Sequence, residues 1–195
     1  MKFLAKNSAS EIHLEELKYS SGSDNSELRL RLLNEQKNFC AYTEKYISGI
    51  DSTEVEHFDP TKKNDDDYYN YYTTLRFANE RKITKYKEYS HSDFFNTLFF
   101  QNEADFNARI RYNNFIYEAT DENDEDAKNL IDYLGFNDDY LFSMRIKHIQ
   151  RLRETIGDFT TEEKLKYFKI YKEDLSFITA IEKEFNIDLS EIINS

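Results

Sequence analysis

An acidic residue next to a histidine, with two asparagines downstream, could together act on a phosphate ester. Glu56 and His57 stand shortly before Pro60, and the asparagines are Asn70 and Asn79. A carboxylate and an amide oxygen suit a hard divalent cation, Mg²⁺ or Mn²⁺, and a neutral imidazole can take a proton from water. We therefore expect Glu56 and Asn79 to hold a metal ion while His57 activates a water molecule. The metal would stabilise the charge that develops on the phosphate and its leaving oxygen.

A short strand and a helix are the elements that would position these side chains. Residues 55–58 form a strand-like run that stops at Pro60, whose ring fixes φ and removes the amide donor. A strand that ends here presents the acid and the histidine at its tip, and a helix is expected over residues 79–89. Glu54 shares a strand face with Glu56 by the two-residue period, so it either supports the site or lies at the surface.

The stretch from residue 39 to residue 83 resembles the HNH (ββα-metal) nucleases. The matching features are an acidic residue before His-Phe-Asp-Pro, then an Asn, then an Asn with basic residues close behind it. In addition, residues 40–43, Cys-Ala-Tyr-Thr, are similar to the Cys-x-Tyr-Cys that opens the first hairpin of that family. The resemblance implies a ββα fold, with two strands around residues 40–58 and a helix that starts near Asn79.

The same resemblance implies a role for each of the four side chains. His57 would be the general base, and Glu56 and Asn79 would be the metal ligands. Asn70 would fix the loop or orient His57, and we count it with the catalytic residues.

The chain departs from the family at a structural zinc site. Many relatives carry two Cys-x-x-Cys knuckles, and the corresponding positions here are Cys40, Thr43, Leu75 and Ala78. A single cysteine excludes a thiolate zinc site, so we expect no structural zinc. The small motif must then be held together by packing.

The charge balance argues against strong unaided DNA binding. The formal net charge is −12, whereas DNA binding draws on Lys and Arg contacts with phosphate. Basic residues nevertheless gather beside Asn79, where a phosphate would have to lie. The expected DNA contacts are Arg76, Arg81, Lys82 and Lys85. We infer that a partner brings DNA to this chain.

Composition indicates a folded α+β protein that is mainly helical. The 195 residues are 39% hydrophobic and 16% aromatic, with only 4 Gly and 1 Pro, which favours helices over a turn-rich β fold. We expect one integrated unit over residues 1–195, with N-terminal helices in 1–38, the HNH ββα core in 39–90 and a mostly helical region with a small hairpin in 91–195. One Cys excludes an intramolecular disulfide. The N-terminus has no long apolar run, so we expect a cytoplasmic protein without a membrane span.

Hydrophobic periodicity and capping signals predict the elements around the central stretch. They are a helix over 8–18 with a capping box from Ser8 to Glu11, a helix over 27–37, a hairpin over 109–117 that turns at Asn113-Asn114, and helices over 126–134 (ended by Gly135), 138–156, 160–171 and 175–185. An apolar stripe along the 138–156 helix would comprise Phe142, Ile146, Ile149, Leu152 and Ile156.

Several aromatic and basic segments have a structural and a functional interpretation. We expect the tyrosines around Asn70 to pack against the protein, although tyrosines can also stack on bases. Residues 94–100 are expected in the core, and His91 is set aside because no ligand pattern surrounds it. Basic residues within 140–172 form either a second DNA-facing or partner-facing surface or a solvated helical face.

The second half of the chain is similar to HNH nucleases of bacterial anti-phage defence, the PtuB-like proteins of Septu and retron-associated systems. The matching features are Ile-x-Tyr-Asn-Asn, then Asp-Ala-x-x-Leu-Ile-x-x-Leu-Gly-Phe-Asn, then Leu-x-x-x-Arg at residues 141–145. This resemblance implies a nuclease held in complex with an ATPase of the ABC or SMC-like kind and released or licensed during infection.

Three hypotheses follow from the sequence. The first is a metal-dependent endonuclease that cuts DNA. The second is a catalytically degenerate interaction module, which the lost zinc cysteines motivate. The third is a nuclease of the same fold that cuts RNA, and digestion of DNA and RNA side by side would separate it from the first.

Overall fold

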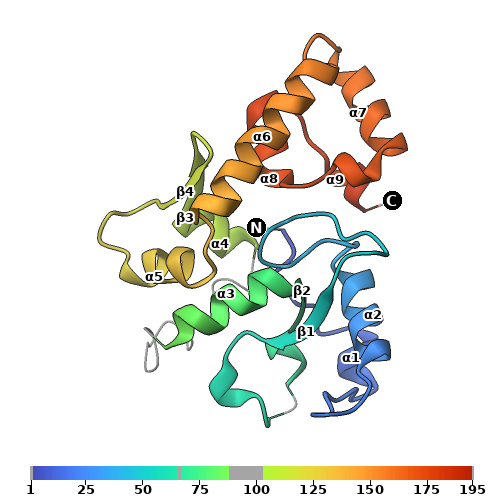
Figure 1. Ribbon diagram of the computed structural model, residues 1–195, viewed down its shortest axis with the longest axis vertical. Helices are drawn as coiled ribbons and strands as arrows, with labels where there is room; N and C mark the ends of the chain where they lie inside the picture. The colour runs from blue at the N-terminus through green and yellow to red at the C-terminus, as the bar shows by residue number, and fades with distance from the viewer. Residues whose placement is uncertain (1, 66, 88–102, 195) are drawn as a thin grey trace.

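Two small antiparallel sheets lie among helices in this α+β chain (Figure 1). The computed structural model describes residues 2–65, 67–87 and 103–194. The expected core segment 94–100 and His91 lie outside the described residues. Within the described part, no helix has both the length and the apolar character needed to cross a membrane.

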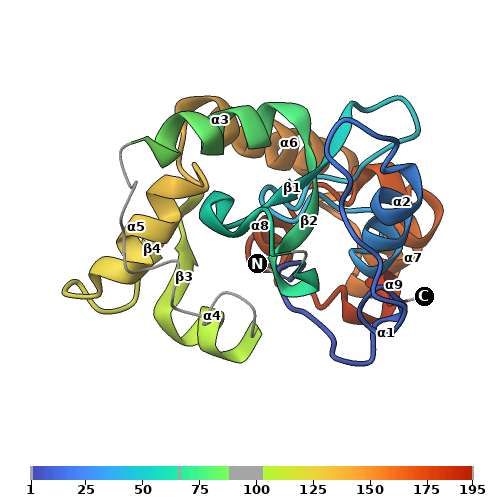
Figure 2. The same cartoon turned by 90° about the horizontal axis from the view of Figure 1, so that it is seen from below.

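The first sheet and the helix after it form a strand–strand–helix unit. Strand β1 (Thr53–His57) pairs antiparallel with β2 (Tyr71–Leu75), so that Glu56 faces Tyr72 and His57 faces Tyr71 across the ladder. Helix α3 (Arg76–Tyr86) follows β2 without a break. It packs against both strands and contacts helix α5 (Glu125–Tyr133) (Figure 2).

The expected positions of the second strand and of the helix start are wrong. Two strands were expected around residues 40–58, but β1 is the one strand there, Phe39 and Tyr46 form an isolated bridge, and β2 follows the polar insert. The sequence Tyr-Tyr-Thr-Thr explains this, because aromatic and β-branched residues favour a buried strand. Helix α3 begins at Arg76 and not near Asn79, because β2 leads straight into it.

The N-terminal helices differ in how well the sequence predicted them. Helix α1 (Glu11–Leu14) is much shorter than the expected helix, and Ser10, not Ser8, accepts a hydrogen bond from the Ile12 amide. The helix ends early because Glu16 adopts a positive φ of 51°. Helix α2 (Ser26–Glu35) confirms the second expected helix within two residues at each end.

The second sheet is the hairpin that the sequence predicted, with its turn shifted by one residue. Strand β3 (Ile110–Asn113) pairs with β4 (Ile116–Ala119), and Asn113 belongs to the strand. Asn114 and Phe115 form the turn, both with positive φ. A two-residue hairpin turn of this hand needs positive φ at both positions. Helix α4 (Glu103–Arg109) leads into β3.

The C-terminal helices agree closely with the predictions. Helix α5 (Glu125–Tyr133) precedes Gly135, whose φ is 65°, and α6 (Asp139–Ile156) follows. A capping box between Thr160 and Glu163 starts the next helix. The remaining elements are α7 (Thr161–Ile170), α8 (Ile178–Phe185) and α9 (Ser190–Ile193), with short 3₁₀ turns at Pro60–Lys62, Tyr68–Asn70 and Lys172–Asp174.

The buried stripe of α6 contains a charge that hydrophobic patterning overlooked. The buried residues are Leu141, Arg145, Ile149, Leu152 and Ile156, whereas Phe142 and Ile146 are only half-buried. The Arg145 guanidinium donates to the carbonyl oxygens of Phe115 and Phe136. It therefore ties α6 to the hairpin turn and to the loop after α5.

A buried carboxylate, Glu44, joins the segment before β1 to the C-terminal helices. Its side chain accepts hydrogen bonds from the Lys2 amide at 3.1 Å and from the amide and hydroxyl of Thr179 at 2.9 and 2.8 Å. Its carbonyl accepts from the Phe177 amide at 2.8 Å. Because Thr179 lies in the first turn of α8, the negative charge also meets the positive end of that helix.

We expect Glu44→Ala to lower the free energy of unfolding by roughly 2–4 kcal/mol, because buried donors lose their acceptor. Urea denaturation measures this loss. The exposed acid Glu173 supplies the matched control, and Glu173→Ala should stay within about 0.5 kcal/mol of the wild type. Equal effects from the two variants would contradict this assignment.

Candidate functional site

The alternation of side chains along β1 divides the expected site residues between two faces of the sheet. Glu54 and Glu56 point toward α3, where they meet Asn79 and Lys82. His57 points to the other face, which α1, α2 and the segment between them cover. The structure therefore brings Glu56 and Asn79 to one face and places His57 on the opposite one.

Asn79 and Glu54 form the first contact between β1 and α3. The Asn79 side-chain amide donates to Oε2 of Glu54 at 3.0 Å, and Nε of Arg76 donates to Oε1 at 2.8 Å. The sequence left the role of Glu54 open, and here it accepts hydrogen bonds from two side chains of the first turn of α3. Asn79 is buried, so this contact fixes the orientation of its amide.

Glu56 and Lys82 form the second contact, a buried ion pair at the end of β1. Their exposed fractions are 3% and 2%. The Lys82 ammonium also donates to the carbonyl oxygens of His57 and Phe58. A hydrogen bond of 2.9 Å from the Tyr133 hydroxyl to the same Phe58 carbonyl adds α5 to this contact.

Burial sets the electrostatics of this ion pair. It raises the pKa of Glu56 and lowers the pKa of Lys82, in each case against the opposing effect of the partner charge. Oε1 of Glu56 accepts no hydrogen bond from any residue that the structure describes. A buried carboxylate with one unused oxygen is a strong site for a cation, and in this structure Lys82 supplies the positive charge.

His57 lies between two tyrosine rings. Its ring centroid is 4.9 Å from that of Tyr19 and 5.1 Å from that of Tyr71, both in edge-on geometry. Tyr19 comes from the segment after α1 and Tyr71 from β2. Tyr72, the next residue of β2, points to the opposite face of the sheet from Tyr71. There the N-terminal segment covers it, and Nζ of Lys6 lies 4.2 Å from its ring centroid.

Asn70 closes the loop between β1 and β2. Its side-chain oxygen accepts from the Asp59 amide at 2.7 Å, and its side-chain nitrogen donates to the Asp59 carbonyl at 2.9 Å. The Phe58 amide donates to the Asn70 carbonyl at 2.9 Å. These are contacts with the loop backbone, of the kind expected if Asn70 fixes the loop. The neighbouring Tyr68, Tyr71 and Tyr72 are buried, as the packing interpretation predicted.

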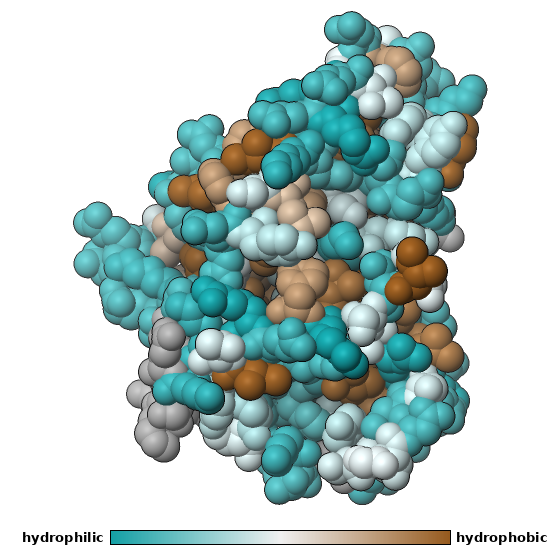
Figure 3. Space-filling view, viewed as in Figure 1, coloured by the Kyte–Doolittle hydropathy of each residue, from teal (hydrophilic) through white to brown (hydrophobic). Residues whose placement is uncertain are grey.

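The four basic residues expected to contact DNA are each engaged with a carboxylate of this chain. The pairs are Arg76–Glu54, Arg81–Asp138, Lys82–Glu56 and Lys85–Asp132. Sequence reasoning missed Asp132 and Asp138 as partners because they lie on or beside α5, some fifty residues away. The basic segment is therefore largely balanced within the fold, and the face of the molecule in Figure 3 is mainly hydrophilic with scattered apolar side chains.

The four positions that the motif resemblance aligned with zinc ligands of HNH nucleases lie in the protein interior. Cys40, Thr43, Leu75 and Ala78 are all buried, and the Leu75 amide lies 3.4 Å from the Cys40 sulfur. Burial raises the pKa of the Cys40 thiol, while hydrogen bonds from Thr43 and the Leu75 amide act in the opposite direction. Apolar packing thus holds the turn before β1 against the start of α3.

The donor set around Glu56 suits a hard cation with few protein ligands. Within the described residues, no group of three or more His, Cys, Asp and Glu side chains is placed to hold a metal ion. A metal here would rely on Glu56 and Asn79, with water or substrate oxygens in its other positions. Mg²⁺ typically binds in this manner. The unused Glu56 oxygen fits such an ion, although Lys82 now lies against the same carboxylate.

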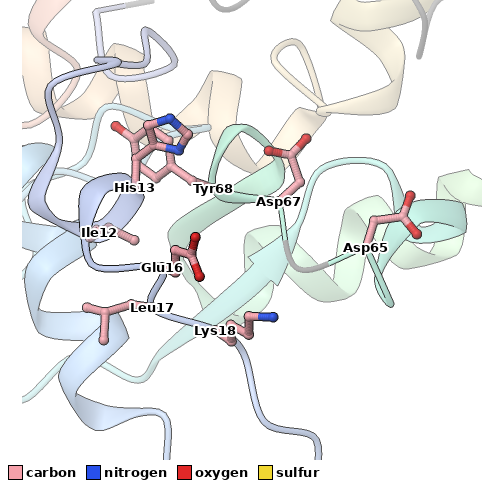
Figure 4. A pocket seen from close by; sticks show the side chains of 8 residues that line it. All are labelled: Ile12, His13, Glu16, Leu17, Lys18, Asp65, Asp67 and Tyr68. Atoms are coloured by element: carbon pink, nitrogen blue, oxygen red, sulfur yellow. The ribbon is translucent and has the colours of Figure 1, made fainter.

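A separate cavity of about 510 Å³ opens between α1 and the loop after β1. Figure 4 shows its lining, which includes His13, Glu16, Asp65 and Asp67. None of the expected site residues lines it. No sequence pattern indicates this cavity, because its two walls come from segments about fifty residues apart.

Comparison of the chain with protein-family models, with characterised proteins and with solved structures finds no match.

A double-mutant cycle tests whether Glu56 and Lys82 act as one buried unit. We expect Glu56→Gln and Lys82→Met each to destabilise the protein by roughly 3–5 kcal/mol, because each leaves an uncompensated buried charge. The double variant should lose clearly less than the sum, as measured by urea denaturation at pH 7. The exposed pair Lys128–Glu125 is the control, with a coupling of about 0.5 kcal/mol or less. Additive losses at Glu56 and Lys82 would contradict the assignment.

Proposed function

We propose that this chain is a metal-dependent endonuclease of the HNH type that hydrolyses phosphodiester bonds in DNA. The observation that carries the proposal is the strand–strand–helix unit, in which β1, β2 and α3 place Glu56 and Asn79 on the same face. Glu56 stands near the end of β1 and Asn79 in the first turn of α3. These are the two side chains that the motif resemblance assigns to the metal.

Two further features support the proposal. Asn70 holds both ends of the loop that separates the strands, which keeps the end of β1 in place. The positions equivalent to two zinc knuckles converge, with Cys40 and Leu75 in contact. In an HNH nuclease that lost its zinc but kept its fold, packed side chains would stand where the cysteine ligands had been.

Each side chain then has a task in hydrolysis. Glu56 and Asn79 would hold Mg²⁺ or Mn²⁺, which would stabilise negative charge on the phosphate and the leaving oxygen. His57 would take the proton of the attacking water, since imidazole is readily neutral near physiological pH. Because His57 now lies on the opposite face, between Tyr19 and Tyr71, its ring must leave that position to act on the same phosphate.

Charge supports a partner in DNA capture. The net charge is −12, and the basic residues along α3 are paired with acids of the same chain. These pairs offset much of the positive charge along α3 that would attract the phosphate backbone, on which most DNA affinity depends. We propose that an ATPase of the Septu type, ABC-like or SMC-like, brings DNA to this chain.

A specific observation favours a second candidate, the catalytically degenerate interaction module. Lys82 forms an ion pair with the Glu56 carboxylate, which would otherwise bind the metal. His57 lies on the opposite face of the sheet from Glu56. In that case the strand–strand–helix unit would serve only as a scaffold for contacts with a partner.

Plasmid cleavage with Mg²⁺ or Mn²⁺ tests the proposal. We expect His57→Ala to reduce cleavage by roughly 100-fold or more, the usual contribution of a general base, without changing the circular dichroism spectrum. The exposed His13 provides a control, and His13→Ala should cut like the wild type. An RNA substrate run in parallel separates DNA-cutting from RNA-cutting activity.

Cleavage that survives in the His57→Ala variant would overturn the role of His57. If the wild type is inactive alone, the assay is repeated with the candidate ATPase. Inactivity in its presence, with no divalent metal bound, would favour the interaction module.

A further inference from the structure

The Lys82 ammonium occupies a small site lined by oxygen atoms. It contacts the carboxylate of Glu56 and the carbonyl oxygens of His57 and Phe58, three successive residues at the end of β1. An ammonium has three N–H donors, and here each has an oxygen acceptor. Both charged side chains are at least 97% buried, so the protein shields the ion pair from bulk solvent.

This site has the properties of a cation site that the chain fills with its own side chain. Among the described residues, the Glu56 carboxylate is the negative group in direct contact with Lys82, and its second oxygen accepts no hydrogen bond from any of them. Asn79 lies one helical turn before Lys82 on the face of α3 that meets β1, where its side-chain amide contacts Glu54. A metal held by Glu56 and Asn79 would thus stand close to the ammonium.

We propose that Lys82 and a divalent metal ion exclude each other at Glu56, so that the protein takes up its metal only when the lysine side chain leaves. This inference rests on the proposed metal-dependent function and adds a regulatory step to it. Lys82 is then an internal counter-ion that keeps the site closed, and its role differs from the DNA contact that the sequence suggested.

Simple electrostatics support mutual exclusion. Two cations a few ångströms apart in a poorly hydrated site repel each other strongly, and one carboxylate cannot neutralise three positive charges. Without any cation, the buried Glu56 carboxylate would be uncompensated, which is costly. One cation at a time is therefore the favourable state, and either the lysine or the metal can provide it.

The hydrogen bonds of Lys82 make its departure costly, and this cost is what would regulate metal uptake. When the side chain leaves, the carbonyls of His57 and Phe58 lose this donor, while the Phe58 carbonyl keeps the hydrogen bond from the Tyr133 hydroxyl. The wild-type protein should therefore bind metal weakly, and removal of the ammonium should tighten binding. A partner or a nucleic-acid phosphate that draws the lysine away would have the same effect.

Binding of Mn²⁺ to the metal-free protein, measured by electron paramagnetic resonance, tests this inference without an activity assay. We expect Lys82→Met to bind Mn²⁺ at least roughly tenfold more tightly than the wild type, since a like charge next to the ion has been removed. Lys82→Arg, which keeps the charge, should bind as weakly as the wild type. Lys2→Met is the matched control, because it removes a half-buried lysine from Glu182 elsewhere in the fold, and it should leave the affinity unchanged.

The outcomes separate this inference from the proposed function. Equal Mn²⁺ affinity of wild type and Lys82→Met would overturn the exclusion while leaving a metal-dependent nuclease intact. Absence of Mn²⁺ binding in every variant would overturn both. Binding that is tighter in Lys82→Met and is lost again when Glu56→Gln is added would support both.

A labelling experiment on the wild type covers the case in which Lys82→Met does not fold. Acetylation of lysines, followed by mass spectrometry, reports which ammonium groups are accessible. Lys82 should be protected without metal and should react several times faster with saturating Mn²⁺, while Lys2 does not change. Protection of Lys82 that persists with Mn²⁺ bound at Glu56 would overturn the inference.

Discussion

The buried ion pair between Glu56 and Lys82 is the interaction on which the central part of this structure depends. It connects the end of β1 to the second turn of α3, and the same ammonium holds the backbone carbonyls that follow Glu56. Glu54 and Glu56 are two residues apart on one face of β1, and Asn79 and Lys82 are three residues apart on one face of α3. The two spacings are similar in length, so Glu54 contacts Asn79 while Glu56 contacts Lys82. This match places the helix across the sheet and keeps both acids on the helix-covered face.

Local signals explain which parts of the fold could be predicted from the sequence. The capping box at Thr160, the C-terminal Gly135 and the hairpin around Asn114 each depend on neighbouring residues, and the structure has all three features. Strand β2 was not predicted, because its tyrosines and threonines show no alternation when both faces are covered. Helix α1 was predicted too long, since the positive φ of Glu16 interrupts an otherwise helical pattern.

The candidate site shows the same division between local and distant information. Residue types and the motif resemblance singled out Glu56, Asn70 and Asn79, and all three lie around the strand–strand–helix unit. The partners of the basic residues on α3 could not be predicted, because they lie far away in the chain and meet α3 only through tertiary packing. The position of His57 on the opposite face follows from the two-residue period of β1, which separates any adjacent pair in a strand.

The central claim is that the carboxylate of Glu56 is a cation site, held by Lys82 in this structure and open to a divalent metal. Anomalous diffraction at the manganese edge, from crystals soaked in Mn²⁺, addresses it directly. The account predicts a manganese peak within bonding distance of Glu56 and the Asn79 amide oxygen, with the Lys82 side chain displaced from the carboxylate. A well-ordered structure in which Lys82 still contacts Glu56, and manganese binds elsewhere or not at all, would contradict it.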